Sequence, residues 1–250
     1  MGTVCSPSFS LGRIITALTL FAISFGYVEA AVVVYLRATY EPLHQRLYPD
    51  RPPTDLFPII RLEQLEAAGP EYVQRLYTEL AREAATLLML AAVAFAAARN
   101  ARQWFAAFGI AFGVWDIFFY IFLRVLIGWP ASLFDWDLLF LLPLPWVGPV
   151  LVPVIVALSM IAAGAFVLWR EARGRPIAFT RAHWMAIISG GALIVVAFCW
   201  DFRHIMAGGM PNPFNWPLFA VGEALGMTAF VHGAGQKPAG RCGEPDRSVS

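Results

Sequence analysis

The stretch WFAAFGIAFGVWDIFFYIFLRVLI at residues 104–127 decides the fold of this chain. A helix needs about 20 mostly apolar residues to cross the hydrocarbon core of a bilayer. This run exceeds that length, with Asp116 and Arg124 as its only charged residues. It is apolar on every face, whereas a transmembrane strand would alternate apolar and polar residues. The sequence therefore predicts a membrane-spanning helix here.

The composition of the whole chain indicates the same class. Of its 250 residues, 59% are hydrophobic and 14% are charged, whereas about 25% of the residues in soluble domains are charged. The formal net charge of +1 leaves no surplus of cations for the phosphates of a nucleic acid. The three cysteines are too few and too scattered for a disulfide framework or a zinc site. The expected partner is the lipid bilayer, and nucleic acid is not expected.

Five further apolar runs predict additional spans, at residues 14–36, 80–98, 147–169, 184–206 and 215–231. The predicted fold is therefore an all-α, polytopic transmembrane bundle of about six spans. We expect one integral membrane domain over residues 1–250, in which residues 237–250 form a disordered tail. The first run continues to residue 36, which favours an uncleaved anchor over a signal peptide that would remove residues 1–30.

The distribution of basic residues predicts the orientation, because cytoplasmic loops collect Lys and Arg. With the N-terminus inside, the cytoplasmic segments would hold Arg13, Arg99, Arg102, Arg170, Arg173, Arg175, Arg181, Lys237, Arg241 and Arg247. The outer side would hold Arg37, Arg46, Arg51, Arg61 and Arg75, all in one long loop, which counts less than a short one. Both termini are therefore expected inside. The richness in Ala and Arg favours a bacterial cytoplasmic (inner) membrane.

Two connections are unusual. The first outer loop, residues 37–79, is rich in proline and contains an amphipathic stretch, and Gly69-Pro70 predicts the start of a helix that runs into the second span. The connection at residues 128–146 is too apolar for an ordinary loop. It is predicted to be an interfacial helix anchored by its tryptophans, or a re-entrant segment that shapes a site.

Ionisable residues inside a membrane are costly, so each is a candidate for function. At a rise of about 1.5 Å per residue, the carboxyl groups of the spans all fall between the bilayer centre and its outer face. The carboxylates and the histidine of this slab have the ligand types of a divalent transition metal, and the predicted ligands are Glu29, Glu83, Asp116, Asp201, His204 and Glu223. Within this set, Asp201 and His204 are three residues apart, so we expect them to share a helix face.

The arginines of the same slab are expected to neutralise part of its negative charge. These are Arg82, Arg124 and Arg203, with Arg82 expected to pair with Glu79 or Glu83. The spans would retain an excess of carboxyl groups, which must then be protonated, hydrated or bound to a cation.

Three functions are compatible with these features. The first is a metal-binding or metal-dependent membrane protein with an outward-facing site. The second is a transporter or permease for a small solute or cation, with the carboxylates as relay or counter-charge. The third is an accessory or scaffold subunit of a membrane complex, with other membrane proteins or further copies of the chain as partners. The sequence names no catalytic residue and no substrate.

Overall fold

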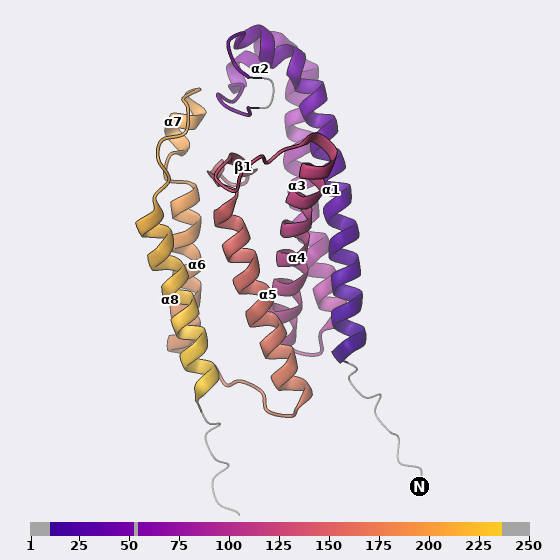
Figure 1. Ribbon diagram of the computed structural model, residues 1–250, viewed down its shortest axis with the longest axis vertical. Helices are drawn as coiled ribbons and strands as arrows, with labels where there is room; N and C mark the ends of the chain where they lie inside the picture. The colour runs from indigo at the N-terminus through magenta and orange to yellow at the C-terminus, as the bar shows by residue number, and fades with distance from the viewer. Residues whose placement is uncertain (1–10, 53–54, 237–250) are drawn as a thin grey trace, which may run out of the picture.

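The fold was established from a computed structural model, which describes residues 11–52 and 55–236. The tail predicted for residues 237–250 lies outside the described residues. Within the described part, six helical segments are long and apolar enough to cross a membrane, which confirms the predicted all-α bundle. Figure 1 shows them packed along a common long axis.

Four of the six long helices in the described residues begin at residues that favour a helix start. The six long helices are α1 (Leu11–Leu47), α3 (Pro70–Ala97), α4 (Ala101–Ile127), α5 (Leu151–Ala172), α6 (Arg181–Phe198) and α8 (Trp216–Gly235). Helix α3 starts at Pro70, as predicted, since proline suits the first turn. The side chain of Asn100 caps α4 by accepting a hydrogen bond of 3.0 Å from the backbone N–H of Gln103.

Helices α1 and α3 rise above the rest of the bundle and carry the short helix α2 (Leu62–Ala68) between them (Figure 1). The 37 residues of α1 measure about 55 Å at 1.5 Å per residue, well beyond a hydrocarbon core of about 30 Å. Much of the region predicted as an outer loop is therefore helix. The end of the bundle that carries α2 is called the α2 end below.

The connection at residues 128–146 does not form the helix that was one of its two predicted forms. Strand β1 (Trp136–Phe140) pairs antiparallel with β2 (Trp146–Pro149), with Asp137 opposite Gly148 and a register shift between Leu138 and Phe140. The prolines of this region remove backbone donors, which disfavours a helix. The hairpin folds across the bundle near the upper end of α5 (Figure 1).

The fifth predicted span is interrupted. Helix α6 ends at Phe198, and after a turn the short helix α7 (Phe202–Met206) begins. Asp201 stands in that turn at the N-cap position of α7, where its side chain makes no capping hydrogen bond. The fifth span is therefore not one continuous helix, and the shared face of Asp201 and His204 stays a prediction.

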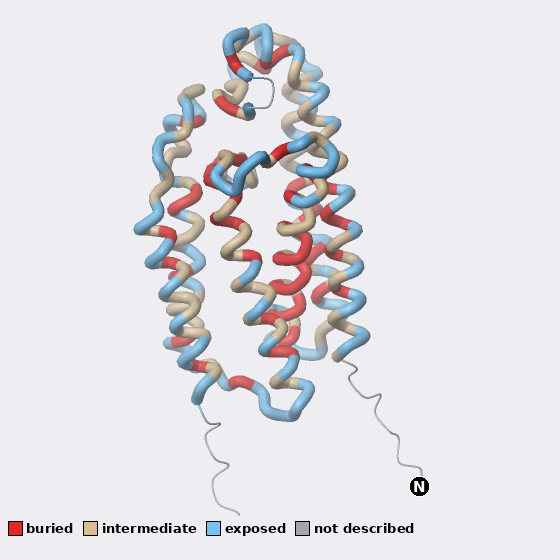
Figure 2. Tube along the Cα trace, in the orientation of Figure 1, coloured by how far each residue is buried: buried red, intermediate tan, exposed pale blue. Residues whose placement is uncertain are grey.

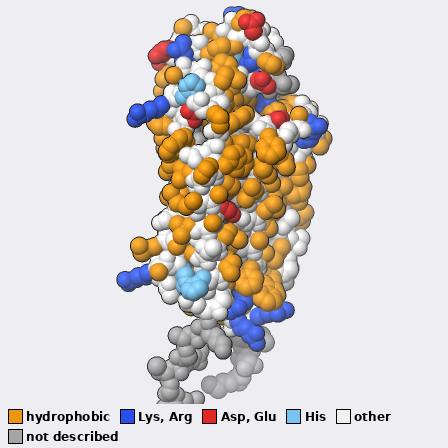
Figure 3. Space-filling model, turned by 60° about the vertical axis from the view of Figure 1, so that its left-hand side comes forward, with side chains coloured by type: hydrophobic (Ala, Val, Ile, Leu, Met, Phe, Trp, Pro, Cys, Tyr) orange, Lys and Arg blue, Asp and Glu red, His pale blue; other side chains and the backbone are white. Residues whose placement is uncertain are grey.

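The apolar core lies where α4 meets α1, α3 and α5, and the buried residues gather on α4 in Figure 2. Gly113 and Gly164 let α4 and α5 approach closely, because a Cβ at either position would come within 2.5 Å of a backbone oxygen of the other helix. Figure 3 shows one outer face, on which hydrophobic side chains cover the middle and Lys and Arg lie toward the two ends. This distribution fits a protein surrounded by lipid.

Candidate binding site

A cavity of about 300 Å³ lies at the α2 end of the bundle, between α1, α3 and α4. The β1 strand, the residues that follow it and the segment that leads into α2 supply the remaining walls. Its charged and polar lining residues are Glu29, Arg37, Tyr40, Glu41, His44, Asp55, Glu79, Arg82, Glu83, Thr86, Asp116, Tyr120 and Asp137. Carboxyl groups therefore outnumber arginines among the described residues that line it.

Arg82 joins α3 to α1 through two carboxylates. Its Nη1 donates to Oε1 of Glu29, and its Nε donates to Oε2 of Glu79 at 2.9 Å, with a second contact between Nη2 and Oε1 of Glu79. Thr86 donates from Oγ1 to Oε2 of Glu29 at 3.2 Å. The predicted pairing of Arg82 with Glu79 is confirmed, and Glu29 rather than Glu83 is its second partner.

Glu83 holds the hairpin against α3. The backbone N–H of Leu141, directly after β1, donates to Oε2 of Glu83 at 2.9 Å and to Oε1 at 3.2 Å. The backbone N–H of Leu141 is therefore satisfied by the Glu83 side chain of α3 rather than by a strand of the hairpin. Glu83 is buried, with 6% of its surface exposed, so this contact lies in a setting where hydrogen bonds to charged groups are strong.

Asp116 is a buried carboxyl group of the cavity with an unpartnered oxygen. It lies on α4 with 5% of its surface exposed, and its Oδ2 has no hydrogen-bond partner in the described part of the chain. An ionised carboxylate is costly to bury without a donor or a counter-charge. Asp116 therefore requires a proton, a water molecule or a bound cation.

Asp137 of β1 reaches the same cavity. Its Oδ2 accepts a hydrogen bond of 2.9 Å from the Tyr120 hydroxyl, and both residues are buried. Burial raises the pKa of the Asp137 carboxyl above its ordinary range, against the opposing effects of the Arg37 charge and the Tyr120 hydrogen bond. The Arg37 guanidinium itself lies 4.2 Å from the centre of the Trp129 ring.

A second group of polar residues surrounds the cavity where α1 passes the segment before α2. Arg51 donates from Nη2 to both carboxylate oxygens of Glu41 at 2.8 Å, and its Nη1 donates to backbone oxygens of Pro52 and Asp55. His44 Nε2 lies 2.6 Å from the carbonyl oxygen of Pro58. These contacts fix the segment over the cavity and neutralise Glu41.

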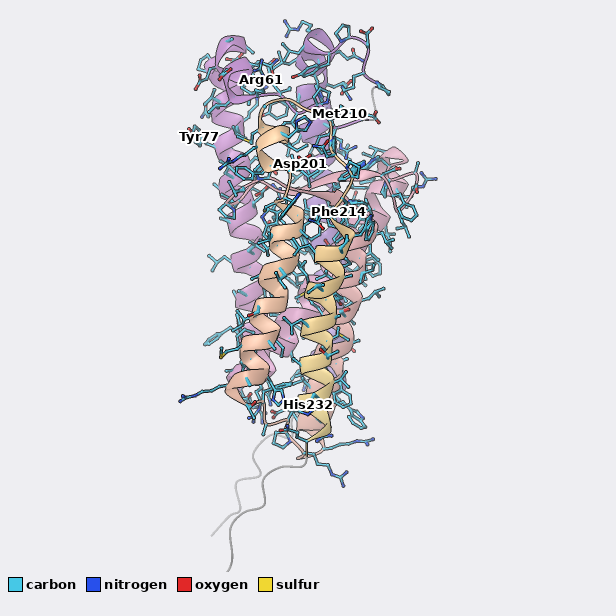
Figure 4. All side chains as sticks on the ribbon, turned by 90° about the vertical axis from the view of Figure 1, so that its left-hand side faces the viewer. Arg61, Tyr77, Asp201, Met210, Phe214 and His232 are labelled. Atoms are coloured by element: carbon cyan, nitrogen blue, oxygen red, sulfur yellow. The ribbon has the colours of Figure 1, made fainter. Side chains whose placement is uncertain are left out.

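Three of the six predicted metal ligands converge on the cavity: Glu29, Glu83 and Asp116. The other three do not line it, so the expected convergence of all six is corrected to these three. Asp201 instead accepts hydrogen bonds from the backbone N–H of Asn212 at 2.9 Å and from its Nδ2 at 2.9 and 3.0 Å. Figure 4 shows Asp201 near the α2 end, with Met210 and Phe214.

Glu223, His204 and two of the predicted pairing arginines have other surroundings. Ser159 of α5 donates to Oε1 of Glu223 on α8, and His204 is exposed. Arg124 donates to the carbonyl oxygens of Gly128 and Pro130, and Arg203 lies 5.7 Å from the ring centre of Phe202. Neither arginine forms an ion pair with a carboxylate of the described residues, which corrects the prediction for both.

Several charged cavity residues were not among the predicted site residues, and Arg37 and Asp137 show why. Arg37 was assigned to the outer loop because the apolar run ends at Leu36, but α1 continues for several turns beyond it. Asp137 was missed because only the spans were searched for ionisable residues, whereas it lies in the apolar connection between two of them. Extending that search to residues 128–146 would have found Asp137.

The comparisons with known proteins found no match: no family model, no curated protein and no solved structure matches this chain.

Proposed function

We propose that this chain is a multi-pass membrane protein that binds a small organic cation in the cavity at its α2 end. The observation that carries the proposal is Asp116, a buried carboxyl group that lines the cavity with one oxygen unpartnered. A cation seated beside it would supply both a counter-charge and hydrogen-bond donors.

The charges around Asp116 support a cationic ligand. Glu29 and Glu79 share Arg82, and Glu41 is paired with Arg51. The lining carboxyl groups without an ion pair in the described residues are Asp55, Glu83, Asp116 and Asp137. Against them stands Arg37, whose guanidinium packs on Trp129. The cavity therefore retains a negative charge whenever these groups are ionised.

The apolar part of the lining favours an organic ligand over a metal ion. Trp115, Phe119 and Tyr120 bring aromatic rings to the cavity, and aromatic faces attract organic cations. A transition metal needs several ligand atoms gathered around one point. No group of three or more His, Cys, Asp or Glu residues is arranged to hold a metal in residues 11–52 and 55–236. The divalent metal and the metal-dependent activity stay predictions without a formed site.

The second candidate is transport of the same cation. On the side of the cavity away from the α2 end, Leu18, Leu90 and Ala111 are buried with 0–1% exposure and close the space between α1, α3 and α4. This arrangement favours a ligand that enters and leaves the cavity from the α2 end. Transport would require this apolar layer to open.

The location of the protein follows from its charge distribution. We propose that the α2 end faces the outside of a bacterial cytoplasmic membrane, because the arginines of the opposite end satisfy the positive-inside rule. The cavity would then take its ligand from outside the cell. An accessory role within a membrane complex, or assembly with further copies, stays a prediction.

Titration calorimetry on the purified full-length protein in phosphatidylcholine nanodiscs tests the proposal. The probes are tetraethylammonium, n-butylamine and spermidine, with Mn²⁺ as the test for a metal. We expect at least one organic cation to bind with one-to-one stoichiometry, and Asp116→Asn to weaken it at least tenfold. Glu223→Gln is the matched control, since Glu223 is a carboxyl group of a span outside the cavity. No binding of any organic cation, or binding unaffected by Asp116→Asn, would overturn the proposal.

A further inference from the structure

The lining of the cavity extends along the helix axes. Its lining positions on α1 run from Glu29 through Val33 and Tyr40 to His44, which recur every three or four residues along one face. At about 1.5 Å per residue this face spans roughly 22 Å. On α3 the lining runs from Leu76 to Thr86, roughly 15 Å by the same measure. A ligand that fills the cavity is therefore extended along the helix axes.

The carboxyl groups lie at separate levels along that length. Asp116 and Glu83 are at the deep end, where Glu29 also contacts Arg82 and Thr86. Tyr120 is one turn, roughly 6 Å, nearer the α2 end than Asp116, and its hydroxyl contacts Asp137. Glu41 and the exposed Asp55 form the outer level, called the mouth below, where Arg51 donates to the Glu41 carboxylate and to the backbone oxygen of Asp55. Glu41 is twelve residues beyond Glu29 on α1, which corresponds to roughly 18 Å.

Between Glu29 and Glu41, the apolar residues Val33 and Leu36 of α1 line the cavity together with Arg37 and Tyr40. Leu76 of α3 and Leu56 of the covering segment line the same cavity. An ammonium group of a ligand is stabilised by hydrogen bonds to the carboxyl groups. The methylene groups between two ammoniums are stabilised by burial against the apolar side chains. Adjacent amines of an aliphatic polyamine are separated by about 5 Å along an extended chain, judged from ordinary C–C and C–N bond lengths. This spacing is close to one turn of a helix.

From this arrangement of carboxyl groups and apolar side chains we infer that the ligand of the cavity is a linear aliphatic polyamine, with its inner ammonium at Asp116 and its outer ammonium at Asp55. The inference rests on the proposed function, because it specifies which organic cation the same cavity takes. It adds a requirement that the proposed function lacks, namely that several charges be distributed along a flexible chain.

A series of amines of increasing length tests the inference, again by calorimetry in phosphatidylcholine nanodiscs, which carry no anionic lipid. The series is n-butylamine, 1,4-diaminobutane, spermidine and spermine, with tetraethylammonium as a compact cation. We expect affinity to rise along the series by at least tenfold from butylamine to spermidine. Tetraethylammonium should bind more weakly than spermidine.

Two variants separate the contribution of the deep end to binding from that of the mouth. Asp55→Asn changes an exposed side chain, so it is expected to fold, and it should weaken spermine at least threefold while leaving butylamine unchanged. Asp116→Asn should weaken every amine of the series. Glu63→Gln, on α2 with a side chain 83% exposed and outside the cavity lining, is the control and should change neither.

The outcomes separate the inference from the proposed function. If butylamine or tetraethylammonium binds as tightly as spermidine and depends on Asp116, the polyamine inference is overturned and the proposed function stands. An Asp55→Asn variant that weakens butylamine as much as spermine also overturns it. If none of the amines binds, both fail.

Discussion

The Tyr120 hydroxyl donates a 2.9 Å hydrogen bond to Oδ2 of Asp137, and this contact connects the C-terminal half of α4 to strand β1. Both side chains are buried with about 5% exposure. The polar contacts that attach the β1–β2 hairpin to the bundle therefore include Tyr120 on α4 and Glu83 on α3.

Tyr120→Phe should destabilise the protein by about 1–3 kcal/mol, because it removes a side-chain donor from the buried Asp137 carboxyl. Thermal unfolding in detergent, followed by tryptophan fluorescence, measures the effect. Tyr77→Phe is the control, since Tyr77 is 62% exposed on α3, and its effect should stay within about 0.5 kcal/mol. Equal effects of the two substitutions would contradict a structural role for the contact.

Arg82→Gln should be more disruptive, with a loss of roughly 3 kcal/mol, because it leaves Glu29 and Glu79 without their cation. Adding Glu29→Gln to this variant should recover part of the loss, since one unpaired carboxylate is then removed. The unfolding midpoints of the single and double variants measure this. Strictly additive losses would show that Arg82 and Glu29 do not act as a pair.

The stability of the protein should depend on Asp137 in a pH-dependent way. The pKa of this carboxyl is raised in the folded state by burial, so the folded protein holds the proton more tightly than the unfolded chain does. The stabilisation that protonation provides is complete below the unfolded pKa of about 4 and is lost as the pH rises through the raised folded pKa. Arg37 limits the size of this effect.

The test compares the wild-type protein with Asp137→Asn, which cannot ionise at this position. The stability of the wild type relative to Asp137→Asn should fall as the pH rises from about 4 toward neutrality. Thermal midpoints measured at several pH values give this difference. A difference that is constant with pH, or that grows in favour of the wild type, would contradict the prediction.

Adjacent glycines of α6 should respond oppositely to alanine. A Cβ at Gly190 would lie 2.6 Å from the backbone oxygen of Gly222 on α8, whereas a Cβ at Gly191 meets nothing within 4 Å. Gly190→Ala should therefore separate α6 from α8 and cost about 1–3 kcal/mol. Gly191→Ala should be neutral or stabilise by up to about 1 kcal/mol, since alanine is the better helix former. Equal effects would refute the close packing of α6 on α8.

Cysteine labelling tests the predicted orientation. Single cysteines at Tyr77 and Met210, both near the α2 end (Figure 4), should react with a membrane-impermeant maleimide in intact cells. A cysteine at Ala178, which is exposed in the connection between α5 and α6, should react only after the membrane is permeabilised. The background is a chain whose native cysteines are replaced by serine. The reverse pattern would place the cavity on the cytoplasmic side.

The sequence by itself was enough to establish the membrane class and to locate the spans. In the part of the chain that the structure describes, the six apolar runs correspond to six helical segments able to cross a membrane, because the bilayer imposes length and apolarity on each helix separately. The helix start at Pro70 was also predictable, because it depends on one proline and its immediate neighbours in the sequence. The pairing of Arg82 with Glu79 also followed from spacing along one helix.

The composition of the site was only partly predictable. Glu29, Glu83 and Asp116 were predicted as site residues because a charged group inside a membrane is costly. The same reasoning also selected two residues outside the cavity: Asp201, which accepts a hydrogen bond from Asn212, and Glu223, which accepts one from Ser159. Position along a span gives the depth of a side chain but does not determine its direction toward one neighbour or another.

The tertiary structure alone decided which charges share a cavity. It brought Asp137 from a connecting hairpin against Tyr120, and it carried Arg37 into the same space through the extension of α1. These relationships depend on how the helices rotate and pack against one another, which is determined by contacts between residues far apart in the chain. Whether a segment lies in lipid or in water depends on the residues of that segment, so the sequence predicts it. That Asp116, Glu83 and Asp137 line one cavity depends on how the whole protein packs.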